Sequence, residues 1–317
     1  MLLEASDLVA GFGSNTVLHG VSFRVHEGEI AGILGLNGAG KSVTMKVVGG
    51  IVPARSGRIS LDGVDITSLP AEARVAAGMA HVPQGRQVFP ELTVEQNLRL
   101  GAYVLRRRER SRYAPLLDSL YDRFPILRDR RTQAAGLLSG GEQAMLAVAR
   151  ALISEPKLVL VDEASAGLAP VMVEEVFQVL KQVNDSGVTI LMVEQNVTFS
   201  LRIADRVHIM QQGSIVYEGD VPSLDRNKVA DYLGVGRLLG SHVEAAGRSR
   251  QAKAGMDDPI EERPPSREQA KPEVKTTKRK TAPSAKSARK KPAAIKKAAT
   301  GSRSPKKKTS RATGKKR

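Results

Sequence analysis

The chain has 317 residues, a net charge of +16, no Cys or Trp, and 3% aromatic residues. Its positive charge is confined to one end, because residues 241–317 hold 24 basic and 7 acidic side chains whereas residues 1–240 hold 25 and 26. The lack of Cys excludes disulfides and thiolate metal sites, and no apolar run reaches the roughly 18 residues of a membrane-spanning helix. The N-terminus lacks the basic segment and apolar stretch of a secretory signal. We therefore expect a cytoplasmic protein.

Short apolar runs in the first 240 residues predict strands that alternate with helices. Runs of this kind occur at residues 2–9, 17–25, 29–34, 58–61, 79–82, 158–161 and 188–193. A helical pattern covers residues 41–48, shortly after the third run. The later runs are almost continuously apolar, which is typical of a parallel sheet covered on both faces. The pattern therefore predicts an α/β fold.

Residues 86–156 differ from their surroundings because they are rich in charge and helical in period. Helical patterns lie at residues 94–105, 113–124 and 142–153. We expect them to form a helical insertion within the α/β domain. The basic cluster at residues 106–112 is interpreted as a solvated helix end rather than a nucleic-acid site.

The strongest motif is residues 35–42, Gly-Leu-Asn-Gly-Ala-Gly-Lys-Ser, which lies between an apolar strand and a helix as a phosphate loop requires. Glycines let the backbone N–H groups wrap around phosphate oxygens, and the helix start adds a positive dipole. Lys41 is expected to reach the β- and γ-phosphates, and the Ser42 hydroxyl to bind Mg²⁺. The candidate nucleotide-binding residues are Gly35, Leu36, Asn37, Gly38, Ala39, Gly40, Lys41 and Ser42.

Two acids follow the apolar run at residues 158–161 and complete a phosphoryl-transfer site. Asp162 is expected to bind Mg²⁺ through its water shell, and Glu163 to polarise the attacking water. The alternative is a strand-end turn or a helix cap. Two independent parts of one site in one chain favour the catalytic interpretation.

Residues 138–143, Leu-Ser-Gly-Gly-Glu-Gln, begin a long helix, and with them the sequence resembles ATP-binding-cassette ATPases over residues 2–237. The resemblance implies a P-loop NTPase core with an antiparallel β subdomain and a helical insertion. It also implies that Ser139, Gly140 and Gly141 close over ATP bound by an opposite subunit. A helix start can bind an anion, whereas the plainer interpretation of these residues is a helix cap with a Gly pair.

Other residues take their roles from the same resemblance. Phe12 occupies the place of the aromatic side chain that stacks on adenine, and Gln84 that of the loop glutamine that contacts Mg²⁺ and the water. Gln195 lies where most of the family has a switch histidine, so it can bond the γ-phosphate but cannot be protonated. Residues 163–170 match the loop that contacts the facing subunit in this family, and Ala169 lies where that loop usually has an acid.

These departures make the chain similar to the second ATPase of branched-chain amino acid importers and their amide or urea relatives. The resemblance implies import of a small polar solute through membrane-spanning permease chains, with a second cassette ATPase, an external solute-binding protein, and a location on the inner face of the cell membrane. Copies of this chain pairing as a homodimer remain an alternative.

The resemblance leaves out the basic end of the chain. Residues 238–317 lack aromatic side chains and are rich in Lys, Ala and Pro, so we expect a disordered tail. Such a tail attracts nucleic acid or anionic lipid without specificity, or is a solvated appendage. An alternative function is therefore a non-transport cassette ATPase associated with nucleic acid through its tail.

Overall fold

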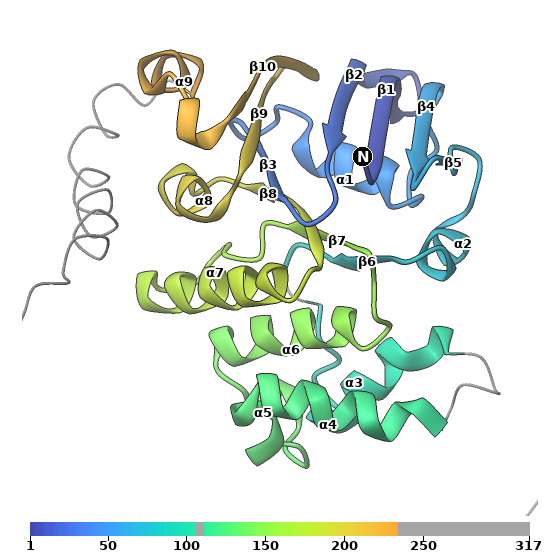
Figure 1. Cartoon of the computed structure of the whole chain (residues 1–317), viewed down its shortest axis with the longest axis vertical. Helices are drawn as coiled ribbons and strands as arrows, with labels where there is room; N and C mark the ends of the chain where they lie inside the picture. Colours follow the sequence, from blue (N-terminus) through green and yellow to red (C-terminus); the bar gives the residue numbers. More distant parts are fainter. Residues whose placement is uncertain (86, 106–110, 234–317) are drawn as a thin grey trace, which may run out of the picture. The chain divides into compact units, whose positions relative to one another are not determined.

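A six-stranded sheet in the order β10-β9-β3-β8-β7-β6 forms the centre of the computed structural model, which describes residues 1–85, 87–105 and 111–233 (Figure 1). Its strands from β9 to β6 run parallel, and β10 pairs antiparallel with β9. The strands are β3 (Ile30–Leu34), β6 (Met79–Val82), β7 (Leu158–Asp162), β8 (Thr189–Glu194), β9 (Arg206–Gln211) and β10 (Ser214–Asp220).

A second, antiparallel sheet has the order β2-β1-β4-β5. Its strands are β1 (Leu3–Phe12), β2 (Asn15–Val25), β4 (Ser56–Leu61) and β5 (Val64–Asp65). The backbone N–H of His19 on β2 donates to the Gly213 carbonyl at 2.8 Å, which joins this sheet to the turn between β9 and β10.

Helices cover both faces of the central sheet. The α-helices are α1 (Lys41–Val48), α2 (Ala71–Ala76), α3 (Val94–Gly101), α4 (Tyr113–Arg123), α5 (Pro125–Asp129), α6 (Gly140–Leu152), α7 (Pro170–Asp185), α8 (Val197–Ile203) and α9 (Arg226–Leu233), and short 3₁₀ turns are η1 (Ala102–Val104), η3 (Ala135–Leu137) and η4 (Val221–Ser223). Helices α3 to α6 gather together on one side of the sheet, in the lower part of Figure 1.

The central strands bury side chains on both faces, and alternation along each strand divides them between two cores. On β7, Val159 and Val161 pack with the helices α3 to α7, whereas Leu158 and Leu160 pack with α1 and the antiparallel sheet. This two-sided burial explains why the runs are continuously apolar. Because β3, β8 and β7 are neighbouring parallel strands, their carboxyl ends lie side by side.

The helix predicted over residues 94–105 is shorter than expected. The α-helix ends at Gly101, and η1 continues the chain as a tighter turn. A Cβ on Gly101 would lie 2.1 Å from the Arg150 carbonyl oxygen of α6. The close approach of α3 to α6 at this glycine is therefore a tertiary contact that the helical period does not encode.

The architecture confirms the predicted α/β core with an antiparallel subdomain and a helical insertion. The boundary at residue 237 stays a prediction, and the predicted disordered tail lies outside the described residues, as does most of the basic cluster at 106–112. In the part of the chain that the structure describes, no helix is both long and apolar enough to cross a membrane.

A buried guanidinium connects α2 to α1. Arg74 is 2% exposed and donates to the carbonyl oxygens of Val47 and Val48 at 2.8 and 2.6 Å, at the last turn of α1. It also donates to the carbonyls of Leu69 and Thr67, each at 2.9 Å. A positive charge at a helix C-terminus is favourable because the last carbonyls carry partial negative charge.

Candidate nucleotide site

The loop of residues 35–42 joins β3 to α1 in a conformation that depends on glycine. Gly38 has φ +79° and Gly40 has φ +105°, values that side chains with a Cβ rarely adopt. At Gly35 the limit is space, since a Cβ would lie 2.4 Å from the Met210 carbonyl oxygen. Gly40 also precedes the first residue of α1 without a capping side chain, so the N–H groups at this helix start are available to an anion.

Lys41 is buried at the start of α1 and lies across the loop. Its ammonium donates to the carbonyl oxygens of Gly35 at 2.9 Å and Leu36 at 3.1 Å, and it lies 3.9 Å from Glu163 Oε1. Burial lowers the pKa of the Lys41 ammonium, and the negative charge of Glu163 opposes this shift. The side chain is therefore a buried cation at the mouth of a phosphate-binding loop.

The Ser42 hydroxyl donates to Asp162 Oδ1 at 2.9 Å, although 120 residues separate the two. Asp162 is the last residue of β7 and is buried. Burial raises the pKa of its carboxyl, and the hydrogen bond from Ser42 opposes that shift. A hydroxyl and a carboxylate in contact are hard oxygen ligands of the kind that Mg²⁺ prefers, so the residues present fit the metal.

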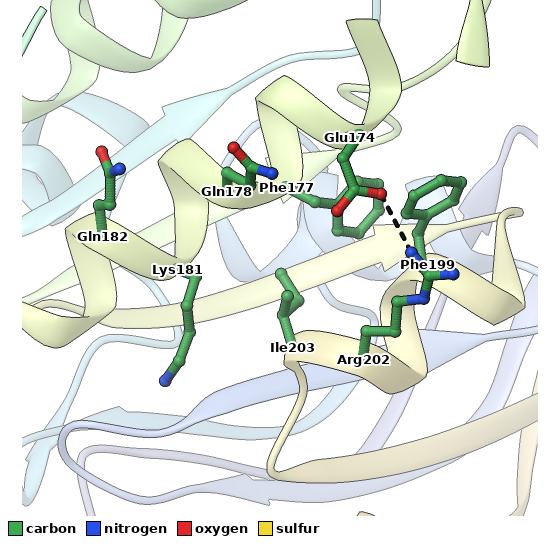
Figure 2. A pocket seen from close by; sticks show the side chains of 8 residues that line it. All are labelled: Glu174, Phe177, Gln178, Lys181, Gln182, Phe199, Arg202 and Ile203. Atoms are coloured by element: carbon green, nitrogen blue, oxygen red, sulfur yellow. Dashed lines mark hydrogen bonds and ion pairs between the residues drawn. The ribbon is translucent and has the colours of Figure 1, made fainter. Parts of the chain in front are cut away.

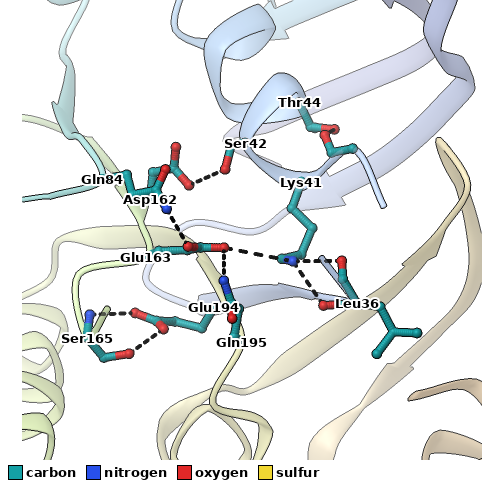
Figure 3. A network of polar contacts seen from close by, with 12 residues as sticks. Leu36, Lys41, Ser42, Thr44, Gln84, Asp162, Glu163, Ser165, Glu194 and Gln195 are labelled. Atoms are coloured by element: carbon teal, nitrogen blue, oxygen red, sulfur yellow. Dashed lines mark hydrogen bonds and ion pairs between the residues drawn. The ribbon is translucent and has the colours of Figure 1, made fainter. Parts of the chain in front are cut away.

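Glu163 follows Asp162 and is the meeting point of three predicted residues. Gln84 Nε2 donates to its Oε2 at 2.6 Å, Gln195 Nε2 donates to its Oε1 at 2.9 Å, and Lys41 faces the same carboxylate (Figure 3). Its backbone is left-handed, with φ +46°, which is uncommon for a residue with a side chain. The structure thus brings Gln84, Glu163 and Gln195 together from three separate loops.

A second carboxylate lies beside this group and was missed by the sequence reasoning. Glu194, the last residue of β8, is 1% exposed and accepts hydrogen bonds from Ser165 N at 3.1 Å and Ser165 Oγ at 2.6 Å. Burial raises its pKa to about 7, with the Ser165 hydrogen bonds acting in the opposite direction. The signal that could have found it is the continuous apolar run that Glu194 ends, since all six residues of β8 are buried.

The residues expected to meet a second subunit lie on another part of the fold. Ser139 is exposed and caps α6, where its hydroxyl accepts from Glu142 N at 3.3 Å while the Glu142 side chain accepts from Ser139 N at 2.7 Å. A Cβ on Gly141 would lie 2.3 Å from Cε at the flexible end of the Met172 side chain, so α6 and α7 approach closely at this glycine. The capping interpretation of Ser139 is therefore confirmed.

A pocket of about 200 Å³ lies over the phosphate loop. It is lined by Val17, Asn37, Gly38, Gly40, Lys41, Ser42, Val43 and Glu163. Phe12 is outside this lining, at the end of β1, and is 52% exposed. Its ring is accessible for stacking, but the described contacts do not join it to the loop.

Comparison with known proteins identifies the family. Residues 18–166 match the model of the ABC transporter family. The chain is 42% identical to the high-affinity branched-chain amino acid transport ATP-binding protein BraG of Pseudomonas aeruginosa, over 70% of this chain and 95% of BraG. The chain belongs to the ABC transporter ATPases. A probable branched-chain amino acid transport ATP-binding protein, LivF of Archaeoglobus fulgidus, is 36% identical over 74% of this chain and 99% of its own length.

Solved cassettes share the fold of this ABC ATPase. An ATP-binding cassette of an ABC transporter in its ADP conformation superposes with a TM-score of 0.64 at 28% identity, covering 73% of this chain and 95% of its own. The lipopolysaccharide export ATP-binding protein LptB of Escherichia coli K12 is 35% identical over 73% of this chain. Relatives of similar identity thus serve different cargoes. The match to transporter ATPases favours transport over the nucleic-acid alternative, whose basic tail lies outside the described residues.

Proposed function

We propose that this ABC ATPase energises import of a branched-chain amino acid, or a related small polar solute, through a separate permease. The similarity to BraG, which extends over 95% of that protein, supports this cargo over lipopolysaccharide, since the identity to LptB is lower. The partners would be membrane-spanning permease chains, an external solute-binding protein, and a second cassette ATPase or a second copy of this chain. The cassette would then act at the inner face of the cell membrane.

The observation that carries the catalytic assignment is the convergence of Gln84, Gln195 and Lys41 on the Glu163 carboxylate. A buried carboxylate held by two amides is positioned to accept a proton from water. Lys41 would neutralise charge on the β- and γ-phosphates, and Gln195 would bond the γ-phosphate. Ser42, Asp162 and Gln84 would hold Mg²⁺, whose charge stabilises the phosphate oxygens in phosphoryl transfer.

Ser139, Gly140 and Gly141 would act on the nucleotide of a facing cassette. The start of α6 exposes Ser139 and carries the positive end of the helix dipole, so an anion brought by another chain can bind there. Phe12 would stack on the adenine of the ATP that its own chain binds. In this proposal one ATP contacts residues of two chains.

A groove between α2, α3 and α6 would be the docking site for the permease. It has a volume of about 360 Å³, and its rim includes Phe89, 50% exposed, and Leu100, 44% exposed. The Arg150 guanidinium lies 5.4 Å from the centre of the Phe89 ring. The lining residues are Val75, Ala80, His81, Phe89, Leu100, Gly101, Arg150, Ala151 and Ser154. An apolar helix end of a membrane partner would bury this exposed surface.

The test is affinity capture from gently solubilised membranes, with the full chain and with a version ending at Gly240. We expect permease chains and a second cassette ATPase to accompany both versions, and the captured assembly to transport a branched-chain amino acid in vesicles when ATP is supplied. Capture of lipopolysaccharide-export components would contradict the cargo. Capture of nucleic-acid-bound proteins that nuclease removes, without a permease, would contradict transport.

A further inference from the structure

Three successive residues at the end of β8 hold the segment that follows β7. The Val193 carbonyl accepts from Glu163 N at 2.9 Å, and the Glu194 carboxylate accepts from both Ser165 N and Ser165 Oγ. Gln195 then donates to the Glu163 side chain at 2.9 Å. Figure 3 shows Ser165 and Glu194 facing each other beside Glu163. The residue that carries the expected base is thus held by a bond at its own backbone N–H and by two bonds at Ser165, two residues later.

The Ser165–Glu194 pair is shielded from water, which makes its hydrogen bonds strong. Glu194 is 1% exposed and Ser165 is 9% exposed. In a low-dielectric interior, a hydrogen bond to a carboxyl group is stronger than in water, and an unpaired carboxyl is costly. The backbone N–H and the hydroxyl of Ser165 each donate to a different carboxylate oxygen of Glu194. The pair therefore fixes the position of residue 165 relative to the end of β8.

The segment needs such an anchor because its backbone is strained. Glu163, at the start of this segment, has φ +46°. A non-glycine residue in the left-handed region persists only when its surroundings fix it. Without a contact at residue 165, Glu163 can relax toward ordinary φ and carry its carboxylate away.

Helix α7 follows the segment after β7, and helix α8 follows the segment after β8. The two helices contact each other through side chains outside the Ser165–Glu194 pair. Phe177 of α7 and Phe199 of α8 stack with ring centres 5.6 Å apart, and Arg202 pairs with Glu174 at 3.0 Å (Figure 2). Helices α7 and α8 therefore contact each other directly, and the Ser165–Glu194 contact joins the segments that precede them.

We propose that Ser165 and Glu194 are positioning residues for ATP hydrolysis, which hold the Glu163 carboxylate where it meets Gln84, Gln195 and Lys41. This inference rests on the proposed role of Glu163 as the base. The pair also fixes the first half of the segment 163–170, which would face the second cassette. Misplacement of a catalytic group by 1 Å can lower turnover by about 100-fold.

The test uses the full chain with Mg-ATP. Ser165→Ala removes one of the two hydrogen bonds, and we expect kcat to fall about ten-fold while the dissociation constant for ATP stays within about two-fold. Ser165→Thr keeps the hydroxyl and should restore most of kcat. Ser186→Ala is the matched control, because the Ser186 hydroxyl makes a bond of the same 2.6 Å length to the Val183 carbonyl at the far end of α7.

Two further variants separate this inference from the proposed function. Glu194→Gln keeps a hydrogen-bonding group toward both Ser165 atoms and should retain at least about half of kcat. Glu163→Gln measured in parallel should lower turnover about 1,000-fold. If Ser165→Ala hydrolyses ATP like the unmodified chain while Glu163→Gln is inactive, the positioning role is wrong and the base role stands. Equal loss of ATP binding and kcat in Ser165→Ala would also overturn it, whereas an active Glu163→Gln would overturn the base role.

Discussion

The carboxyl edge of the central sheet and the start of α6 are both suited to anions, yet they are built differently. At the sheet edge, Lys41, Asp162 and Glu163 are buried and bonded to residues of other elements. At α6, Ser139 is exposed and bonded to Glu142 in its own first turn. The first region is organised within one chain, whereas the second offers its surface outward. We therefore expect the sheet edge to fix nucleotide chemistry and α6 to act only against a facing chain.

The largest effect should come from the sheet edge. Glu163→Gln keeps the size of the side chain and removes the base, so turnover should fall about 1,000-fold while ATP binding is retained. Phosphate release and nucleotide binding are the two measurements. Glu27→Gln in the turn between β2 and β3 is the control, since that exposed side chain lies outside the network. Turnover within two-fold of the unmodified chain would remove Glu163 from the base role.

Burial at the same edge should appear as a pH-dependent stability. The pKa of Glu194 rises from 4.5 to about 7 because burial disfavours its charged form. Between these values the folded chain keeps a proton that the unfolded chain releases, so this contribution to stability is lost as pH rises from 4.5 to 7 and stays lost above it.

Glu194→Gln cannot titrate and should therefore escape this loss. The free energy of unfolding of the variant, relative to the unmodified chain, should increase by about 3 kcal/mol between pH 4.5 and pH 8. Denaturant titrations of both proteins at each pH measure the difference. A constant difference across this range would show that the Glu194 carboxyl is not buried in solution.

The start of α6 offers a smaller and more selective effect. Asp is as good a helix cap as Ser, so Ser139→Asp should leave stability within about 0.5 kcal/mol. Its negative charge should repel the phosphate of a facing cassette and lower turnover about ten-fold or more. Thr93→Asp is the matched control, because Thr93 caps α3 through the same box with Gln96. Equal turnover in both variants would leave Ser139 as a cap alone.

The smallest effect compares two helix starts. Helix α6 has a capping box, whereas Ala169 at the start of α7 provides no capping hydrogen bond although its backbone has the extended conformation of a cap. Ala169→Asp should raise the free energy of unfolding by about 1 kcal/mol, through a cap and the helix dipole. Ala169→Val should give no gain, and an equal gain in both variants would exclude capping as the cause.

The phosphate loop, the helix after it and the apolar strands were predictable because their signals are local. The helix predicted over residues 41–48 and the strand over 79–82 have the predicted bounds, since glycine freedom and continuous apolar runs act within a few residues. Gln84 and Gln195 were singled out by family resemblance alone, and their hydrogen bonds to Glu163 were not predicted. Each of these glutamines by itself would be an ordinary loop residue.

The Ser165–Glu194 pair shows what the sequence leaves out. The continuous apolar run predicts that β8 is buried on both faces, but a carboxyl group at the end of such a strand is costly to bury unless it has a partner. That partner is 29 residues away in sequence, in a loop without regular periodicity. The early end of α3 at Gly101 has the same origin, since backbone contact with α6 decides it. Long-range contacts, rather than local preference, determine both.

The hydrogen bonds from Arg74 join helix α2 to the C-terminal end of helix α1. Helix α1 has the phosphate loop at one end and the Arg74 guanidinium at the other, and Val75, the next residue of α2, lines the groove beside α3 and α6. Separating α2 from α1 would break the Arg74 bonds to the last carbonyls of α1, and a hydrogen bond of a charged group contributes about 1.5–3 kcal/mol. A displacement of α2 at the groove that preserves these bonds is therefore expected to shift α1 and the phosphate loop with it.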